Sequence, residues 1–183
     1  MPFWKQEYSI KFAKTHTRFL RMRTPYFEPS SLGLPPKYIA VKFYSSECFP
    51  DTKENMEIAR SVIKKSSEKL PIVILDTGFK IDDHHDYIFN KSENVYNIAS
   101  FLTSRNNLDL QTKVVSHAEA FIGTYGGFSY IAPLYGVSSL ALYAKSNFSR
   151  NHLDLAGRIF SGPPFGLLMP VHTSNIETIH NFF

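Results

Sequence analysis

Residues 108–144, LDLQTKVVSHAEAFIGTYGGFSYIAPLYGVSSLALYA, decide the fold. Apolar residues recur at helical spacing over 109–120, and a short apolar run follows at 121–123. After a glycine-rich turn, a second helical segment covers 129–135 and a second apolar run covers 139–144. Two apolar runs joined through a helix are typical of parallel strands, which need such a crossover. The stretch therefore predicts a helix that leads into a strand–helix–strand unit.

The same alternation continues on both sides of this stretch. Upstream, YIAVKFY (38–44) and PIVILD (71–76) predict buried strands with a helix over 53–69 between them. The other predicted elements are a short strand at 94–98, a helix at 152–160, a strand at 166–171 and a helix at 175–182. Alternating strands and helices favour a mostly parallel sheet covered on both faces. The predicted class is α/β, a Rossmann-like three-layer domain.

The first 36 residues have a different composition. Residues 4–22 predict a helix rich in Lys and Arg, and TPYFEPSSLGLPP (24–36) predicts a linker because it is rich in Pro, Ser and Gly. We therefore divide the chain into a basic helical stub with its linker (1–36) and a Rossmann-like domain (37–183). The basic segment fits either a solvated helix face or attraction to an anionic donor or membrane surface. It carries no nucleic-acid-binding motif, so no nucleic-acid partner is expected.

Composition indicates a globular protein. The chain has 183 residues, of which 43% are hydrophobic and 20% charged, and its net charge is +4. No apolar run approaches the roughly 20 residues that cross a bilayer, and no signal-peptide core is evident at the start of the sequence. The single cysteine, Cys48, fits a reducing compartment. These features predict a cytoplasmic protein.

The glycine-rich turn is the strongest candidate for a ligand site. Ligands of open parallel sheets bind beyond the carboxyl ends of the strands, which here are followed by 45–51, 77–86 and 124–129. In the last segment, Gly126 and Gly127 lead directly into a helix, where exposed N–H groups favour phosphate. Ser129 would add a hydroxyl, and Pro133 fits if the helix begins near Ser129 or Tyr130. The same glycines equally fit a tight turn without a ligand.

The chain from Tyr38 to about Phe160 resembles the C-terminal, donor-binding domain of GT-B glycosyltransferases, particularly the heptosyltransferase-like group. The resemblance rests on YIAVKFYSS (38–46), on PIVILDTG (71–78) and most of all on 108–144. Positions that match the family pattern are Gly123, Gly126, Ile131, Ala132, Gly136 and Val137. Thr124 and Tyr125 stand where these enzymes usually carry an acidic residue, so the resemblance does not extend to a particular base or sugar.

What the resemblance implies is one GT-B half that binds a nucleotide-diphosphate sugar, whose sugar is transferred to a glycan or other acceptor. The diphosphate would lie against 124–129 and the nucleoside against 77–78 and 105–108. The implied donor-binding residues are Tyr44, Ser45, Ser46, Thr77, Gly78, Arg105, Thr124, Gly126, Gly127, Phe128 and Ser129. Lys42 or Arg105 would offset charge on the leaving diphosphate, although Lys42 equally fits a structural lysine. No cofactor or metal is implied, no catalytic residue is assigned, and the implied partner is an acceptor-binding domain or chain.

Two alternatives remain open at this point. A non-catalytic module would keep the nucleotide-sugar site, or bind a partner, without transfer chemistry. A serine hydrolase would use Ser129, Asp154 and His172, which follow the order of the α/β-hydrolases, although Ile131 replaces the second glycine of their G-x-S-x-G turn. The acidic stretch 82–86 (DDHHD) is better explained as a solvated turn than as a metal site, because adjacent histidines point in different directions.

Overall fold

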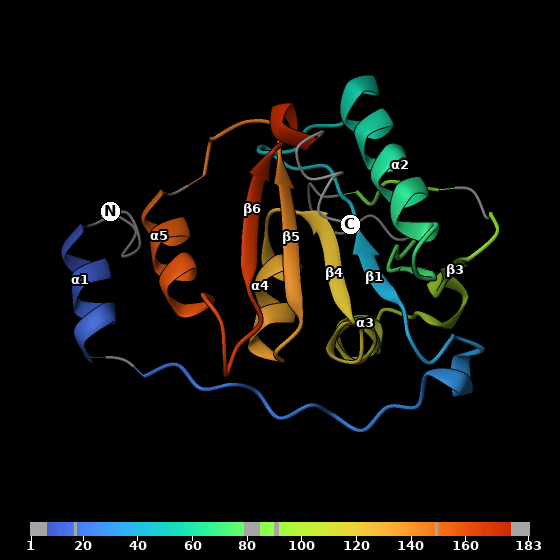
Figure 1. Cartoon of the computed structure of the whole chain (residues 1–183), viewed down its shortest axis with the longest axis horizontal. Helices are drawn as coiled ribbons and strands as arrows, with labels where there is room; N and C mark the ends of the chain where they lie inside the picture. Colours follow the sequence, from blue (N-terminus) through green and yellow to red (C-terminus); the bar gives the residue numbers. More distant parts are fainter. Residues whose placement is uncertain (1–6, 17, 79–84, 90–91, 149, 177–183) are drawn as a thin grey trace.

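The computed structural model describes residues 7–16, 18–78, 85–89, 92–148 and 150–176. Its centre is one six-stranded sheet in which every neighbouring pair is parallel. The strands are β1 (Ile39–Lys42), β2 (Ile72–Ile74), β3 (Val95–Asn97), β4 (Ala120–Thr124), β5 (Ser138–Tyr143) and β6 (Leu168–His172). The arrowheads of β1, β4, β5 and β6 in Figure 1 accordingly point toward the same edge of the sheet. The predicted α/β class with a parallel sheet is confirmed.

The strand order is β3-β2-β1-β4-β5-β6, the order of the dinucleotide-binding Rossmann fold. The chain builds the sheet outward from β1 in one direction and then returns to β1 to build it outward in the other. β1 and β4 therefore lie side by side, with Lys42 paired to Gly123. This junction is the topological switch point, where sheets of this kind bind their ligands.

Helices cover both faces of the sheet. They are α1 (Glu7–His16), α2 (Lys53–Ser67), α3 (Asn107–Ser116), α4 (Gly127–Leu134) and α5 (Arg150–Ile159), with short 3-10 turns η2 (Pro29–Leu32), η3 (Ala99–Phe101) and η4 (Thr173–Asn175). Successive side chains of a strand point to opposite faces. Ile39 and Val41 of β1 pack in one core cluster with α2 and α5, and Ala40 packs in the other with α3 and α4. The result is the predicted three-layer arrangement.

Helix α4 starts two residues earlier than the sequence predicts. It begins at Gly127, so Pro133 lies inside its last turn rather than near its start. The earlier start arises because Ser129 bonds back to Gly126 through both its donor and its acceptor capacity. The carbonyl of Pro133 accepts hydrogen bonds from the amides of Gly136 and Gly166.

The N-terminal segment runs along the domain. Figure 1 shows it passing beneath the amino ends of the strands, from α1 near α5 to the start of β1. The amide of Met22 donates to the carbonyl of Leu134 at 2.8 Å, and the Arg21 guanidinium donates to the carbonyl of Tyr135 at 3.0 Å. Leu34 is buried in the core cluster beneath α3 and α4. The segment from Arg21 to Leu34 is thus tied to the 37–183 domain by hydrogen bonds at its start and by a buried side chain at its end.

Most predicted elements correspond in type to those of the structure, but the helix predicted at 109–120 ends at Ser116 as α3, and Ala120 already begins β4. The predicted helix at 175–182 lies mostly outside the described residues, and the 3-10 turn η4 occupies 173–175. The predicted helix at 4–22 is found as α1, which ends at His16. Within the part of the chain that the structure describes, no helix is both long and apolar enough to cross a membrane.

Candidate functional site

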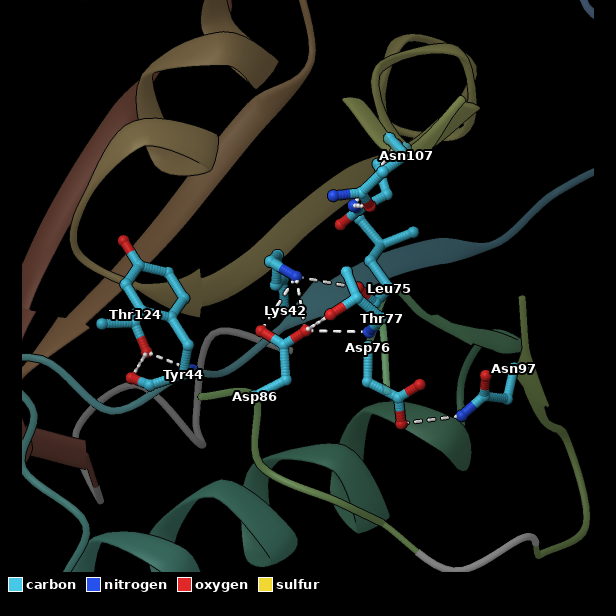
Figure 2. A network of polar contacts seen from close by, with 10 residues as sticks. Lys42, Tyr44, Leu75, Asp76, Thr77, Asp86, Asn97, Asn107 and Thr124 are labelled. Atoms are coloured by element: carbon cyan, nitrogen blue, oxygen red, sulfur yellow. Dashed lines mark hydrogen bonds and ion pairs between the residues drawn. The ribbon is translucent and has the colours of Figure 1, made fainter. Parts of the chain in front are cut away.

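A buried lysine lies at the switch point. Lys42 is the last residue of β1 and is 7% exposed. Its ammonium donates to the Leu75 carbonyl at 2.9 Å and lies 2.9 Å and 3.0 Å from the two carboxylate oxygens of Asp86. Figure 2 shows it between these two partners. The ring of Phe128, at the start of α4, has its centroid 5.4 Å from the Lys42 nitrogen.

Asp86 reaches Lys42 because the chain after β2 returns to the end of β1. Tyr44 and Asp86 form an isolated antiparallel bridge. Two backbone hydrogen bonds flank the bridge, from the Ser45 amide to the His85 carbonyl and from the Tyr87 amide to the Phe43 carbonyl, each at 2.9 Å. The Thr77 amide and hydroxyl also donate to the Asp86 carboxylate, at 2.8 Å and 2.9 Å. The Asp86 carboxylate therefore accepts hydrogen bonds from three donors, the Lys42 ammonium and the amide and hydroxyl of Thr77.

Lys42, Asp76 and Asp86 form a charged cluster at the switch point, and burial shifts the pKa values of Lys42 and Asp76. Burial lowers the pKa of Lys42, while the charge of Asp86 and the hydrogen bond to it act in the opposite direction. Burial also raises the pKa of Asp76, which follows β2, although the Asn97 amide donates to its carboxylate at 2.9 Å. The cluster thus holds one lysine and two carboxylates with little access to water.

Asp76→Asn tests the burial of this carboxylate. A raised pKa means that the folded state binds a proton more tightly than the unfolded state, so the ionised carboxylate costs stability at neutral pH. That cost is absent below the unfolded pKa of about 3.8, grows as pH rises from there to the raised pKa of the folded state, and is constant above it. At pH 7 the variant is expected to melt at a higher temperature than the parent. The gap should narrow as pH falls toward 4, and a gap that widens on acidification would contradict the assignment.

The glycine-rich turn is held by its own side chains and by Tyr44. The Thr124 hydroxyl donates to the Tyr44 carbonyl and accepts from the Tyr44 amide, both at 3.0 Å. A Cβ atom at Gly126 would overlap the Tyr44 hydroxyl, so this glycine permits a close approach. Burial raises the pKa of Tyr44 to about 12, and a backbone hydrogen bond from Gly127 lowers it in part. The Tyr44 hydroxyl thus lies against the start of α4.

The structure brings together most of the predicted donor-binding residues. Those at or beside the switch point are Lys42, Tyr44, Ser45, Thr77, Thr124, Gly126, Gly127, Phe128 and Ser129. Ser46 turns away, because its hydroxyl contacts Cys48 at 3.3 Å and accepts from the Phe49 amide. Gly78 is exposed with a left-handed backbone (φ 61°). Arg105 is exposed in the turn before α3, and among the described residues no contact joins it to the cluster.

The contacts contradict the serine-hydrolase alternative. Ser129 is fully buried, and its hydroxyl donates to the Gly126 carbonyl at 2.7 Å while accepting from the Gly126 amide. His172, at the end of β6, contacts the Ser174 hydroxyl and the Ala144 carbonyl with its two ring nitrogens. Asp154 is exposed on α5. The serine and the histidine are each committed to other partners, so no triad forms. The Ser129 hydroxyl is likewise not presented to a phosphate.

The acidic stretch at 82–86 is only partly described. His85 contacts the Asp51 carboxylate at 3.0 Å, and Asp86 contacts Lys42. Residues 82–84 lie outside the described residues. The expectation of a solvated turn is wrong for Asp86, whose side chain is 11% exposed. Asp86 is buried because it pairs with Lys42, a lysine at the end of a buried strand whose charge would be costly to bury without an anionic partner.

The basic N-terminal segment is exposed beside the domain. Arg18 and Arg23 are exposed, as are Leu20, Met22 and Tyr26 between or near them. Helix α1 packs against α5, with Ala13 buried. Contact with an anionic membrane surface stays a prediction.

Sequence reasoning missed the acidic half of the cluster. Asp76, Asp86 and Asn97 were not among the predicted site residues. The sequence offers two signals: Asp76 directly follows a buried strand, and a lysine within an apolar strand requires a carboxylate from elsewhere in the chain. Neither signal identifies Asp86, which is 44 residues away from Lys42 in the sequence.

The fold and the site together define an α/β protein with a Rossmann-like parallel sheet and a polar cluster at its switch point. No protein-family model matches the chain, and no curated protein sequence matches it. Among solved structures, the chain is similar to KpsC of Thermosulfurimonas dismutans, a beta Kdo 2,4 transferase. The two are 12% identical, with a TM-score of 0.41 over 78% of this chain and 46% of the other. The chain spans about half the length of that protein.

Proposed function

We propose that this chain is the donor-binding domain of a glycosyltransferase and binds a nucleotide-diphosphate sugar at the switch point. The observation that carries the proposal is the meeting of Lys42, the Gly126–Gly127 turn and Phe128 where β1 and β4 end. Ligands of open α/β sheets bind at this position, and a cation near a helix start suits an anionic ligand. Transfer itself would need an acceptor-binding domain, in the same protein or in a partner chain.

Gly127 marks the surface that the donor would use. It is exposed at the first position of α4, and a Cβ atom placed on it meets no atom within 4 Å. A ligand that lies over the turn would fill this open space. Side-chain atoms added at Gly127 would then compete with the ligand while leaving the packing of the domain intact.

Gly127→Val is therefore expected to weaken donor binding by about tenfold or more, equivalent to about 1.4 kcal/mol, without lowering the melting temperature. The measurement is a thermal-shift panel of UDP, ADP, GDP and CMP with their sugar conjugates. A ligand at about 100 times its dissociation constant stabilises the folded state by roughly 2.7 kcal/mol. The parent protein is expected to respond to one nucleotide, and a tenfold weaker variant to keep about 1.4 kcal/mol of that stabilisation, or about half.

Gly157→Val is the matched control. Gly157 lies within α5, and a Cβ atom there also meets nothing within 4 Å. This variant should keep the full nucleotide response. Equal responses from Gly127→Val and the parent would remove the turn from the donor site. No response of the parent to any nucleotide would contradict the proposed function and favour a module that binds a partner without transfer chemistry.

A further inference from the structure

The hydrogen-bond donors at the switch point already donate to oxygen atoms of the protein itself. The Lys42 ammonium and the Thr77 amide and hydroxyl all point at one carboxylate, that of Asp86. The Gly127 backbone bonds the Tyr44 hydroxyl. An ammonium, a hydroxyl and backbone N–H groups that converge on oxygen atoms are the donors that proteins use to bind phosphate. Lys42, Thr77 and Gly127 therefore form a set of donors of the kind that binds phosphate. In this structure the Asp86 carboxylate and the Tyr44 hydroxyl accept from them.

The two occupants belong to one small backbone unit. Tyr44 and Asp86 face each other across the isolated antiparallel bridge. This bridge places the Asp86 carboxylate at Lys42, while the Tyr44 hydroxyl lies at Gly127. One short pairing of two segments that are distant in sequence thus supplies oxygen atoms to both halves of the donor set.

The charge of the cluster opposes a further anion. Lys42 contributes one positive charge, and Asp76 and Asp86, which both interact with it, contribute two negative charges. The Lys42–Asp86 pair is also largely removed from solvent, where charges act strongly on one another. A diphosphate that approached Lys42 with Asp86 in place would meet excess negative charge. Binding to Lys42 is favourable only if the ligand takes the place of the carboxylate.

We propose that Lys42, Thr77 and Gly127 form an anion-binding site for a diphosphate group, and that the Asp86 carboxylate and the Tyr44 hydroxyl are its internal occupants, which the ligand displaces. The inference rests on the proposed function for the nucleotide attached to that diphosphate. It adds that the chain competes with its own ligand, so that removing an internal occupant strengthens anion binding.

Asp86→Asn tests the competition with inorganic pyrophosphate as the probe. The substitution removes one negative charge and keeps the shape of the side chain. Calorimetric titration is expected to show pyrophosphate binding that is tighter than in the parent by on the order of tenfold, the scale of one charge-assisted hydrogen bond regained. Asp109→Asn is the matched control, since it removes the same charge from an exposed pair with Lys113 on α3. The control should leave pyrophosphate affinity at the parental value.

Tyr44→Phe is the second variant, because it frees the Gly127 backbone without breaking an ion pair and so tests the inference even where Asp86→Asn does not fold. It is expected to tighten pyrophosphate binding several-fold, as one hydrogen bond regained would. Pyrophosphate affinity that stays parental in every folded variant overturns the inference. If the parent nevertheless binds a nucleotide diphosphate, the proposed function stands without it. If the variants gain pyrophosphate affinity but no nucleotide diphosphate binds better than pyrophosphate, the inference stands and the nucleotide-sugar function fails.

Discussion

Lys42→Met is expected to lower the free energy of unfolding by about 3 kcal/mol or more, since removing one partner of a buried ion pair leaves an uncompensated charge. The Lys42 and Asp86 side chains are only 9% and 11% exposed. Methionine keeps most of the aliphatic stem of lysine, so packing in β1 changes little. The dominant loss is the cation that faces Asp86. The Thr77 amide and hydroxyl still donate to the carboxylate, which sets the expected effect at the lower end of the range for such pairs.

Lys113→Met provides a comparison at nearly the same ion-pair distance. The Lys113 nitrogen lies 2.8 Å from an Asp109 oxygen, against 2.9 Å for Lys42 and Asp86, but Asp109 is 65% exposed. An exposed pair of this kind contributes about 0.2–1 kcal/mol. Urea denaturation of both variants at pH 7 would give the two free energies. A loss for Lys42→Met no larger than that for Lys113→Met would show that water reaches the Lys42 pair.

A double-mutant cycle separates the charge effect from the packing effect. Asp86→Asn in the Lys42→Met background removes the orphaned carboxylate, so the double variant should recover part of the stability that Lys42→Met loses. Asparagine also keeps an oxygen that can accept from Thr77. No recovery in the double variant would mean that Lys42 contributes through packing of its stem and not through its charge.

The four inner strands, β1, β2, β4 and β5, were predictable because each is buried along most of its length and is therefore a continuous apolar run. YIAVKFY and SLALYA carry this signal within a few residues, and β1 and β5 fall inside or beside those runs. The candidate position of the site came from the carboxyl ends of the predicted strands and from turn composition, by a general rule for parallel sheets, and ligand binding there stays a prediction. Local sequence and a rule of topology were enough for that part.

The contacts within the site were less predictable, because they depend on partners that sequence spacing does not reveal. Ser129 looked like a ligand contact because it is a hydroxyl near a helix start, but the adjacent backbone of Gly126 satisfies it first. Asp86 looked like part of a solvated turn, but a backbone bridge to Tyr44 brings it to the one buried lysine of the sheet. In both cases the unpaired alternative is costly in a buried position.

Gly123→Ala is the second prediction with a large effect. Gly123 lies in β4 opposite Lys42 of β1, and a Cβ atom on it would overlap the Lys42 carbonyl oxygen and come within 3.0 Å of the Phe121 ring. The first obstacle is backbone of the neighbouring strand, which cannot rotate away as a side chain does. Such overpacking costs about 3 kcal/mol when the surroundings are rigid. The two central strands would have to separate at the end that carries Lys42.

Gly127→Ala makes the same chemical change four residues later, in open space. Urea denaturation is expected to place Gly123→Ala about 3 kcal/mol below the parent and Gly127→Ala within about 0.5 kcal/mol of it. Equal stabilities of the two variants would mean that β1 and β4 tolerate a wider spacing than their pairing indicates. The contrast also bears on function, because the two glycines belong to one motif. Gly123 is required by the packing of the sheet, whereas Gly127 faces open space, where we propose that the ligand lies.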